Sequence, residues 1–345
     1  MIKKDGIIIT KDMKICICGG GSLGHVCAGV LGSLKDVQLN ILSGHPSRWQ
    51  KRITVTDGNG KKYIAQINHV SSRAEDVIVD QDIILICLPG FLIEKTLIDI
   101  KPYIGNAVVG SVVSSTGFFF FAHDILGKEA KLFGFQRVPF ISRVVEYGRT
   151  ANLLGYKSNI SMVLENIKDS IDFCNKIEQL FATPVTLLNN FYEVALSNSN
   201  PILHTGRLYA LFAGREHAVF DHNVLFYKEW NDESSSLLIQ MDLELFQLLE
   251  RLGVHSLPSL LDYYESTDAA SLTKKIQSIP AFQNITSPMK LDNNGWIVDY
   301  ESRYFTEDFP FGLRWIKVLA DEYNIYTPTI NKVLAWGLSL LKKEK

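Results

Sequence analysis

Residues 14–34 read KICICGGGSLGHVCAGVLGSL. The apolar run at residues 14–18 predicts a short buried strand, and the apolar residues after the glycines recur three and four positions apart, which predicts a helix. A strand that passes through G-x-G-x-x-G into a helix is the arrangement that holds a dinucleotide pyrophosphate at the positive end of the helix. The stretch therefore predicts a dinucleotide-binding loop, with a glycine-rich turn that binds no ligand as the alternative.

Each glycine spacing in this loop has a physical role. Gly19 permits the tight turn, Gly21 lets the backbone approach a phosphate, and Gly24 lets the helix pack closely on the strand. The loop residues that we assign to cofactor binding are Gly19, Gly21, Ser22, Leu23 and Gly24.

The rest of the first half alternates β-branched runs with helical stretches. Strands are predicted at residues 37–42, 82–88 and 107–113, which favours a parallel sheet with crossover helices. Residues 51–62 contain Asp-Gly-Asn-Gly and predict a hairpin or a loop insertion, and residues 143–164 predict two or three further strands.

The pattern changes after about residue 190. Residues 191–215, 234–252, 256–266 and 328–343 place apolar side chains three and four apart, as amphipathic helices do. The predicted fold is an α/β Rossmann-type doubly wound domain over residues 1–186, followed by an all-α helical domain over residues 187–345.

Composition excludes several classes of function. The chain has 345 residues, 46% of them hydrophobic, which suffices for about two domains with cores of their own. Its 35 Lys and Arg balance 37 Asp and Glu, so we expect neither nucleic acid nor a membrane surface as a partner, but small molecules. No apolar run reaches the ~18 residues of a membrane span. We expect a soluble, unexported, cytoplasmic protein, and an apolar helical domain favours a homodimer.

The five cysteines do not suggest a disulfide framework or a metal site. They lie in apolar runs or a helical pattern, as buried thiols do. Cys16 and Cys18 are expected to point to opposite faces of their strand and so not to share a metal ion. The histidines show no HxxxH or HExxH spacing, and we predict no metal.

The end of the second predicted strand sets the cofactor preference. A site for NAD places Asp or Glu there to bind the ribose hydroxyls, whereas this sequence has Ser43, followed by GHPSRW without a carboxylate. The Arg48 guanidinium can form paired, charge-assisted hydrogen bonds with a 2′-phosphate. We therefore predict NADP rather than NAD. The alternative is that Arg48, Lys51 and Arg52 form a solvated loop.

Two segments concentrate polar groups among apolar neighbours: SNSNPILH at residues 197–204 and SRYFTEDFPFG at residues 302–312. On residue chemistry alone, Asn200 and Pro201 are typical of a helix start, and His204 is typical of a core histidine with its hydrogen bonds satisfied. The residue types by themselves do not decide between these roles and catalysis.

These motifs together resemble the octopine/nopaline (opine) dehydrogenase family. The resemblance rests on the glycine loop, on DIILICLPG at residues 82–90, on Asn198-x-Asn200 four residues before His204, and on Arg-Tyr-Phe-x-Glu-Asp at residues 303–308 ahead of Gly312. It implies a Rossmann domain and a helical domain, and an NAD(P)H-dependent reductive condensation of a 2-oxo acid with the amino group of an amino acid.

The resemblance also implies roles for individual residues. His204 would be the acid/base residue and Asp308 its partner, since a carboxylate behind an imidazole fixes its tautomer. Arg303 would hold a substrate carboxylate, with an ion pair to Glu307 or Asp308 as the alternative, and Asn200 lies one helical turn before His204. Leu88 and Pro89, with Ser43 and Arg48, complete the predicted cofactor contacts.

Two other functions are weighed against this one. A ketopantoate-reductase-like 2-oxo acid reductase would carry a catalytic Lys at the start of the second domain, but residues 177–227 contain no Lys. A non-catalytic NADP-binding protein would keep the glycine loop without the chemistry. Four arginines either line an anionic-substrate cleft or lie on the surface: Arg143, Arg149, Arg207 and Arg215.

Overall fold

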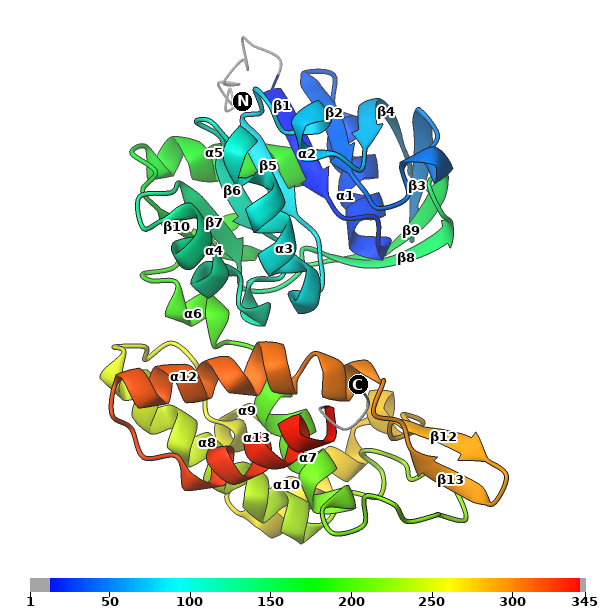
Figure 1. The fold of residues 1–345 in the computed structure, drawn as a ribbon, viewed down its shortest axis with the longest axis vertical. Coiled ribbons are helices and arrows are strands. Elements are labelled where there is room, and N and C mark those ends of the chain that lie inside the picture. Colours follow the sequence, from blue (N-terminus) through cyan, green and yellow to red (C-terminus); the bar gives the residue numbers. More distant parts are fainter. Residues whose placement is uncertain (1–12, 342–345) are drawn as a thin grey trace, which may run out of the picture. The chain divides into compact units, whose positions relative to one another are not determined.

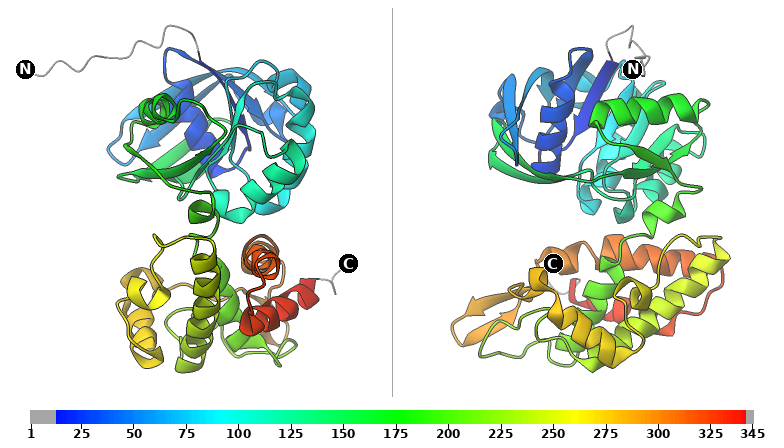
Figure 2. Two further views of the ribbon diagram at one scale, coloured as in Figure 1. Left: turned by 90° about the vertical axis from the view of Figure 1, so that its left-hand side faces the viewer. Right: turned by 180° about the vertical axis from the view of Figure 1, so that it is seen from behind.

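The computed structural model describes residues 13–341, which divide into two compact units between Ala195 and Leu196 (Figures 1 and 2). The first unit is built on an 11-stranded sheet and the second mainly on helices. The boundary predicted from the sequence, 186/187, lies within the short strand β11 (Val185–Leu187) of the first unit.

The sheet has the strand order β11-β10-β7-β6-β5-β1-β2-β4-β3-β9-β8. Its six central strands, from β7 to β4, run parallel to one another, as predicted for a doubly wound domain. The strands before β11 are β1 (Met13–Cys18), β2 (Val37–Leu42), β3 (Arg52–Asp57), β4 (Lys62–Ser71), β5 (Ile83–Ile86), β6 (Val108–Ser111), β7 (Leu132–Phe135), β8 (Phe140–Glu146), β9 (Thr150–Tyr156) and β10 (Ile160–Glu165).

Helices cover both faces of this sheet. Side chains of α1 (Ser22–Gly32) and α5 (Ser170–Phe181) belong to one hydrophobic core. The opposite core takes side chains from α2 (Ala74–Val77), α3 (Gly90–Ile100) and α4 (Phe118–Leu126). A short helix, α6 (Tyr192–Ala195), ends the unit. The parallel sheet with crossover helices is thus confirmed (Figure 1).

The alternation along β1 corrects the prediction for its cysteines. Ile15 and Ile17 face the core of α1, whereas Cys16 and Cys18 both face the opposite core. Positions two apart in a strand share a face, so the expectation that these thiols point apart is wrong. Burial raises the pKa of the Cys16 thiol. Among residues 13–341 no group of three or more His, Cys, Asp or Glu side chains could hold a metal ion.

The predicted hairpin and extra strands are also confirmed, and they position the site described below. Strand β3 pairs antiparallel with β4, β9 runs parallel to β3, and β8 pairs antiparallel with β9. These strands contact α1, so the turn between β8 and β9 reaches the beginning of that helix. Residues far apart in the sequence therefore meet at the glycine-rich loop.

The second unit is helical with one hairpin, β12 (Met289–Asp292) and β13 (Gly295–Val298), which the sequence analysis did not anticipate. The predicted helix at 191–215 is interrupted, because α7 begins at Asn200, and the one at 256–266 is reduced to α9. Residues 342–343 of the last predicted helix lie outside the described residues. The helices are α7 (Asn200–Phe212), α8 (Asp232–Arg251), α9 (Leu260–Tyr263), α10 (Ala269–Ser278), α11 (Arg303–Thr306), α12 (Arg314–Glu322) and α13 (Pro328–Leu341).

A buried carboxylate ties the last helix to the longest one. Glu244 of α8 is 2% exposed, and its two oxygens accept hydrogen bonds from the backbone N–H groups of Thr329 and Ile330, each at 2.9 Å. These N–H groups belong to the first turn of α13, where they have no partner within the helix. A negative charge at this position also interacts favourably with the helix dipole.

A second buried carboxylate in α8, Asp242, makes folding pH-dependent. It accepts a hydrogen bond from Leu260 N–H at 2.9 Å, and burial raises its pKa to about 6. The folded state thus keeps a proton that the unfolded chain releases near its ordinary pKa of 3.8, so the free energy of unfolding falls as pH rises from about 4 to 6.

We expect Asp242→Asn to remove this dependence, because the amide oxygen can still accept from Leu260 N–H without carrying a charge. In urea unfolding at several pH values, the free energy of unfolding of the variant should rise by about 2 kcal/mol relative to that of the wild type between pH 4 and pH 6. A difference in stability that stays constant over that range would contradict this assignment.

Candidate active site

The glycine-rich loop has the conformation that its sequence predicts. Gly19 has φ +132°, which side chains other than hydrogen rarely allow, and Gly21 precedes the first turn of α1. A Cβ on Gly24 would lie 2.2 Å from the carbonyl oxygen of Gly19. The close packing of helix on strand therefore requires glycine at position 24, and the helix presents its first N–H groups toward the loop.

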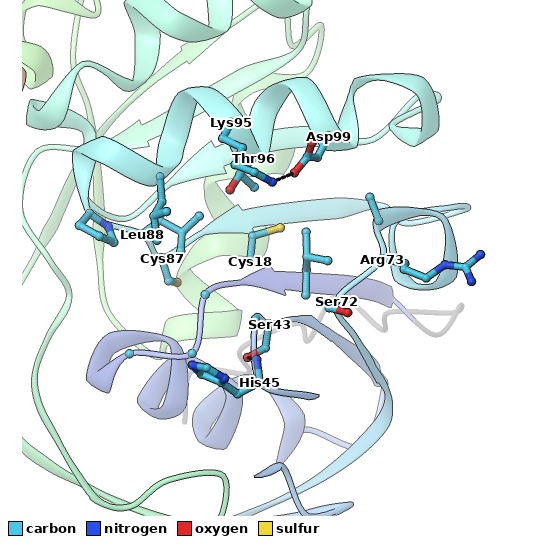
Figure 3. A pocket seen from close by; sticks show the side chains of 18 of the residues that line it. Cys18, Ser43, His45, Ser72, Arg73, Cys87, Leu88, Lys95, Thr96 and Asp99 are labelled. Carbon is cyan, nitrogen blue, oxygen red and sulfur yellow. Dashed lines mark hydrogen bonds and ion pairs between the residues drawn. The ribbon is translucent and has the colours of Figure 1, made fainter. Parts of the chain in front are cut away.

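A cavity of about 710 Å³ opens beside this loop. Of the predicted cofactor residues, Gly19, Gly21, Ser43, Leu88 and Pro89 line it. Figure 3 shows Ser43 and His45 on one side of the cavity and α3, with Lys95, Thr96 and Asp99, on the other. Its position at the carboxyl ends of parallel strands is where doubly wound sheets bind their ligands.

The other four predicted cofactor residues are not among those that line the cavity. Ser22 Oγ accepts a hydrogen bond from Val144 N–H at 3.1 Å, Leu23 packs against the core, and Gly24 lies within α1. Arg48 is exposed, and its guanidinium carbon lies 4.2 Å from the centre of the Tyr147 ring, which does line the cavity.

His25 joins the loop to the turn between β8 and β9. Its Nδ1 lies 2.9 Å from the Gly21 carbonyl oxygen, and its Nε2 accepts a hydrogen bond from Gly148 N–H at 2.7 Å. The two partners fix one neutral tautomer, with the hydrogen on Nδ1. The ring is stacked on Trp49 with 4.2 Å between centroids, and burial lowers the pKa of His25. The sequence analysis did not single out this residue.

In the second unit, the structure brings together two side chains 104 positions apart. His204 Nδ1 lies 2.8 Å from Asp308 Oδ2. His204 is in the second turn of α7, and Asp308 precedes a single π-helical turn at Phe309–Leu313. Their side chains are 12% and 16% exposed, so the pair is shielded without being sealed from solvent. Asp308 can therefore hold the imidazole in one orientation.

Tyr227 completes this arrangement and was not predicted. Its hydroxyl lies 3.0 Å from His204 Nε2. Burial, with Tyr304 as the next cause, raises the pKa of Tyr227 well above its ordinary value, so the phenol stays protonated and donates to Nε2. His204 Nδ1–H then donates to the Asp308 carboxylate, which defines the neutral tautomer with Nε2 facing the phenol.

Arg207, one turn after His204, holds the segment that carries Tyr227. It is 1% exposed and donates to the Phe226 carbonyl from Nε at 3.0 Å, to the Glu229 carbonyl from Nη2 at 2.6 Å and to Ser234 Oγ from Nη1 at 2.8 Å. Burial lowers its pKa to about 10, so the side chain remains charged at neutral pH. Arg207 is thus neither a surface residue nor a cleft residue but an internal anchor.

The remaining predicted substrate residues lie on the surface of this unit. Arg303 is exposed in α11, and Asp308 is paired with His204. Asn200 is exposed as the first residue of α7, which explains Pro201: a proline in the first turn costs no helical hydrogen bond. The structure places Asn200 four positions before His204.

The other three arginines with an open role make local contacts. Arg143 donates to the neighbouring Ser142 carbonyl, and Arg149 pairs with Glu146 on the surface. Arg215 donates to the Leu211 carbonyl and lies over the Phe220 ring.

None of the helices described between residues 13 and 341 is long and apolar enough to cross a membrane.

Comparison with known proteins finds a family match for the second unit and relatives of the whole chain. Residues 187–341 match the family model described as NAD/NADP octopine/nopaline dehydrogenase, alpha-helical domain. The opine dehydrogenase of Haliotis discus hannai is 26% identical over 97% of this chain and 92% of that protein. The second unit therefore matches the octopine/nopaline dehydrogenase family, and the whole chain is similar to opine dehydrogenases. The chain is an opine-dehydrogenase-like oxidoreductase.

Solved structures support the same fold. An octopine dehydrogenase solved with NADH and L-arginine has a TM-score of 0.86 at 22% identity, covering 96% of this chain and 90% of that one. A yersinopine dehydrogenase with bound NADP⁺ has a TM-score of 0.76 at 13% identity, covering 96% and 91%. A nicotinamide cofactor is thus common to these relatives, one with NADH and the other with NADP⁺.

Proposed function

We propose that the protein catalyses the NAD(P)H-dependent condensation of a 2-oxo acid with the amino group of an amino acid, which gives a secondary-amine dicarboxylate. The observation that carries this proposal is the hydrogen-bonded pair of His204 and Asp308, at the positions where the sequence resembles the family. The family relatives support the reaction type, and the side chains described here support the roles that follow.

The residues of the first unit suit a dinucleotide. The cavity borders the glycine-rich loop, and its glycines keep side chains away from the place where a pyrophosphate would lie. The cofactor would supply a hydride to the substrate carbon. Gly19, Gly21, Ser22, Leu23, Gly24, Ser43, Arg48, Leu88 and Pro89 are the residues that we propose for its binding.

His204 is the proposed acid/base residue. As the imine carbon is reduced, the nitrogen must be protonated or kept protonated, and the preceding loss of water requires a proton on the carbinol oxygen. An imidazole can supply and recover that proton near neutral pH. The Asp308 carboxylate accepts from Nδ1–H, so that Nε2, which faces the Tyr227 hydroxyl in this structure, is the nitrogen that would take up and return the proton.

Arg303 and Asn200 are the proposed substrate-binding residues. A guanidinium holds a carboxylate in two directions at once, which orients a 2-oxo acid or amino acid for reaction. The exposure of Arg303 leaves its fork of donors accessible to such a ligand. Asn200 lies one helical turn before His204, where its amide can contact the same substrate.

The proposed reaction is tested by its requirement for two substrates. Purified protein should oxidise NADPH or NADH only when a 2-oxo acid and an amino acid are both present, and mass spectrometry should detect the secondary amine. Oxidation with the 2-oxo acid alone would instead indicate a ketopantoate-reductase-like activity. Cofactor binding without turnover on a broad panel would indicate a non-catalytic protein.

We further propose that NADPH is preferred over NADH. Ser43 stands at the end of β2 where a carboxylate would bind the ribose hydroxyls of NADH, and residues 44–49 offer no carboxylate in its place. Arg48 provides positive charge next to Tyr147 at the cavity wall.

A further inference from the structure

Tyr147 enters the cofactor cavity from outside the parallel part of the sheet. It lies in the turn between β8 and β9, and its side chain lines the cavity. A Cβ on Gly20 would lie 2.2 Å from the Tyr147 hydroxyl oxygen. Glycine at position 20 thus makes room for the phenol, whose oxygen lies directly against the glycine-rich loop.

The hydrogen bonds around Ser43 determine which way the phenol hydrogen points. Ser43 Oγ accepts from Trp49 Nε1–H at 3.1 Å and from His45 N–H at 3.3 Å, which uses both of its lone pairs. Its own hydrogen is then donated to the Tyr147 oxygen, 3.1 Å away. The Tyr147 hydrogen remains to be donated elsewhere, and the cavity is where a ligand oxygen could accept it.

The surroundings of this phenol offer donors and positive charge. Ser43 Oγ already accepts two hydrogen bonds and so has no acceptor capacity left for the O–H of a ribose hydroxyl. The Arg48 guanidinium lies over the Tyr147 ring at 4.2 Å. The two carboxylates that line the cavity are each paired with a cation, Glu75 with Arg73 and Asp99 with Lys95. A phosphate, which only accepts, suits such a site better than a hydroxyl.

We propose that Tyr147 recognises the phosphate on the 2′-oxygen of the adenosine ribose, donating its O–H to a phosphate oxygen beside Arg48. This inference rests on the proposed function, since it requires that the cavity hold a nicotinamide dinucleotide. It makes Tyr147 a specificity-determining residue, and it gives Ser43, which lines the same cavity, the role of orienting the phenol.

The test compares cofactor binding by Tyr147→Phe with binding by the wild type. Loss of one charge-assisted hydrogen bond should weaken NADPH binding about tenfold or more, whereas NADH binding should change less than about threefold. Tyr156→Phe is the matched control, because Tyr156 lies in the same hairpin and its hydroxyl pairs with that of Tyr63 instead. Titration calorimetry measures each affinity without requiring turnover, and melting temperatures check that the variants are folded.

A second measurement uses the unaltered protein. Adenosine 2′,5′-bisphosphate should bind at least about tenfold more tightly than adenosine 5′-monophosphate, and Tyr147→Phe should abolish most of that difference. If Tyr147→Phe weakens NADPH and NADH equally, or weakens neither, the inference is overturned while the proposed function stands. If the wild type binds neither dinucleotide, the proposed function fails and this inference fails with it.

Discussion

Replacing His204 with Gln should reduce kcat for the condensation by a factor of a hundred or more, with little change in the affinity for the cofactor. Glutamine preserves most of the volume of the side chain, but it cannot exchange a proton near neutral pH. Because Nδ1 is held by Asp308 and Nε2 faces Tyr227, loss of the ring removes the centre of a three-residue hydrogen-bonded chain. Steady-state kinetics and cofactor titration together measure both effects.

His255→Gln is the matched control for this experiment. His255 is an exposed histidine of the same unit that pairs with Glu250, far along the chain from the proposed site, and its loss should leave kcat unchanged. Asp308→Asn should also lower kcat, because an amide oxygen can accept from Nδ1–H but cannot stabilise an imidazolium to the same degree. Full turnover in either His204→Gln or Asp308→Asn would refute the assigned roles.

Arg207→Met should produce the largest loss of stability, about 3 kcal/mol in the free energy of unfolding of the second unit. Methionine fills much of the space but leaves the buried carbonyl of Phe226 and the part-buried carbonyl of Glu229 without the donors that Arg207 supplies, and an unsatisfied buried group costs about 1–3 kcal/mol. The same change loosens the segment that carries Tyr227, so kcat should fall as well. Chemical denaturation followed by tryptophan fluorescence measures the stability, since Trp230 lies in that segment.

The control for Arg207→Met is Arg314→Met, which removes the same side chain from an exposed position at the start of α12. Exposed substitutions of this kind usually change stability by less than about 0.5 kcal/mol. Equal unfolding midpoints for the two variants would show that the hydrogen bonds of Arg207 make no net contribution to the free energy of unfolding.

The elements that the sequence predicted best are those encoded by local patterns. The strand, glycine loop and helix at residues 14–34 follow from spacing alone, because each glycine has a steric role that can be assigned from its position. The strand alternation likewise predicted the parallel sheet. The break between α6 and α7 was missed, since apolar residues continue at helical spacing across residues where the chain is not helical.

Contacts between distant residues were harder to predict. The pairing of His204 with Asp308 was anticipated only because both lie in motifs that resemble one family. The sequence analysis missed the roles of Tyr227, His25 and Tyr147, because no local sequence pattern predicts which residue a single aromatic side chain contacts. His25 meets Gly148 across 123 positions, and Tyr147 meets Ser43 across 104, so that only the three-dimensional fold reveals either contact.

His25 connects the turn at residues 146–149 to the glycine-rich loop, so the conformation of the loop depends on that turn. A deletion or insertion there would withdraw the Gly148 amide from Nε2 and leave a shielded nitrogen without its donor. Most surface turns tolerate insertions and deletions, but we expect this turn not to tolerate them. A change of cofactor preference engineered at Tyr147 must therefore exchange side chains and keep the length of this hairpin unchanged.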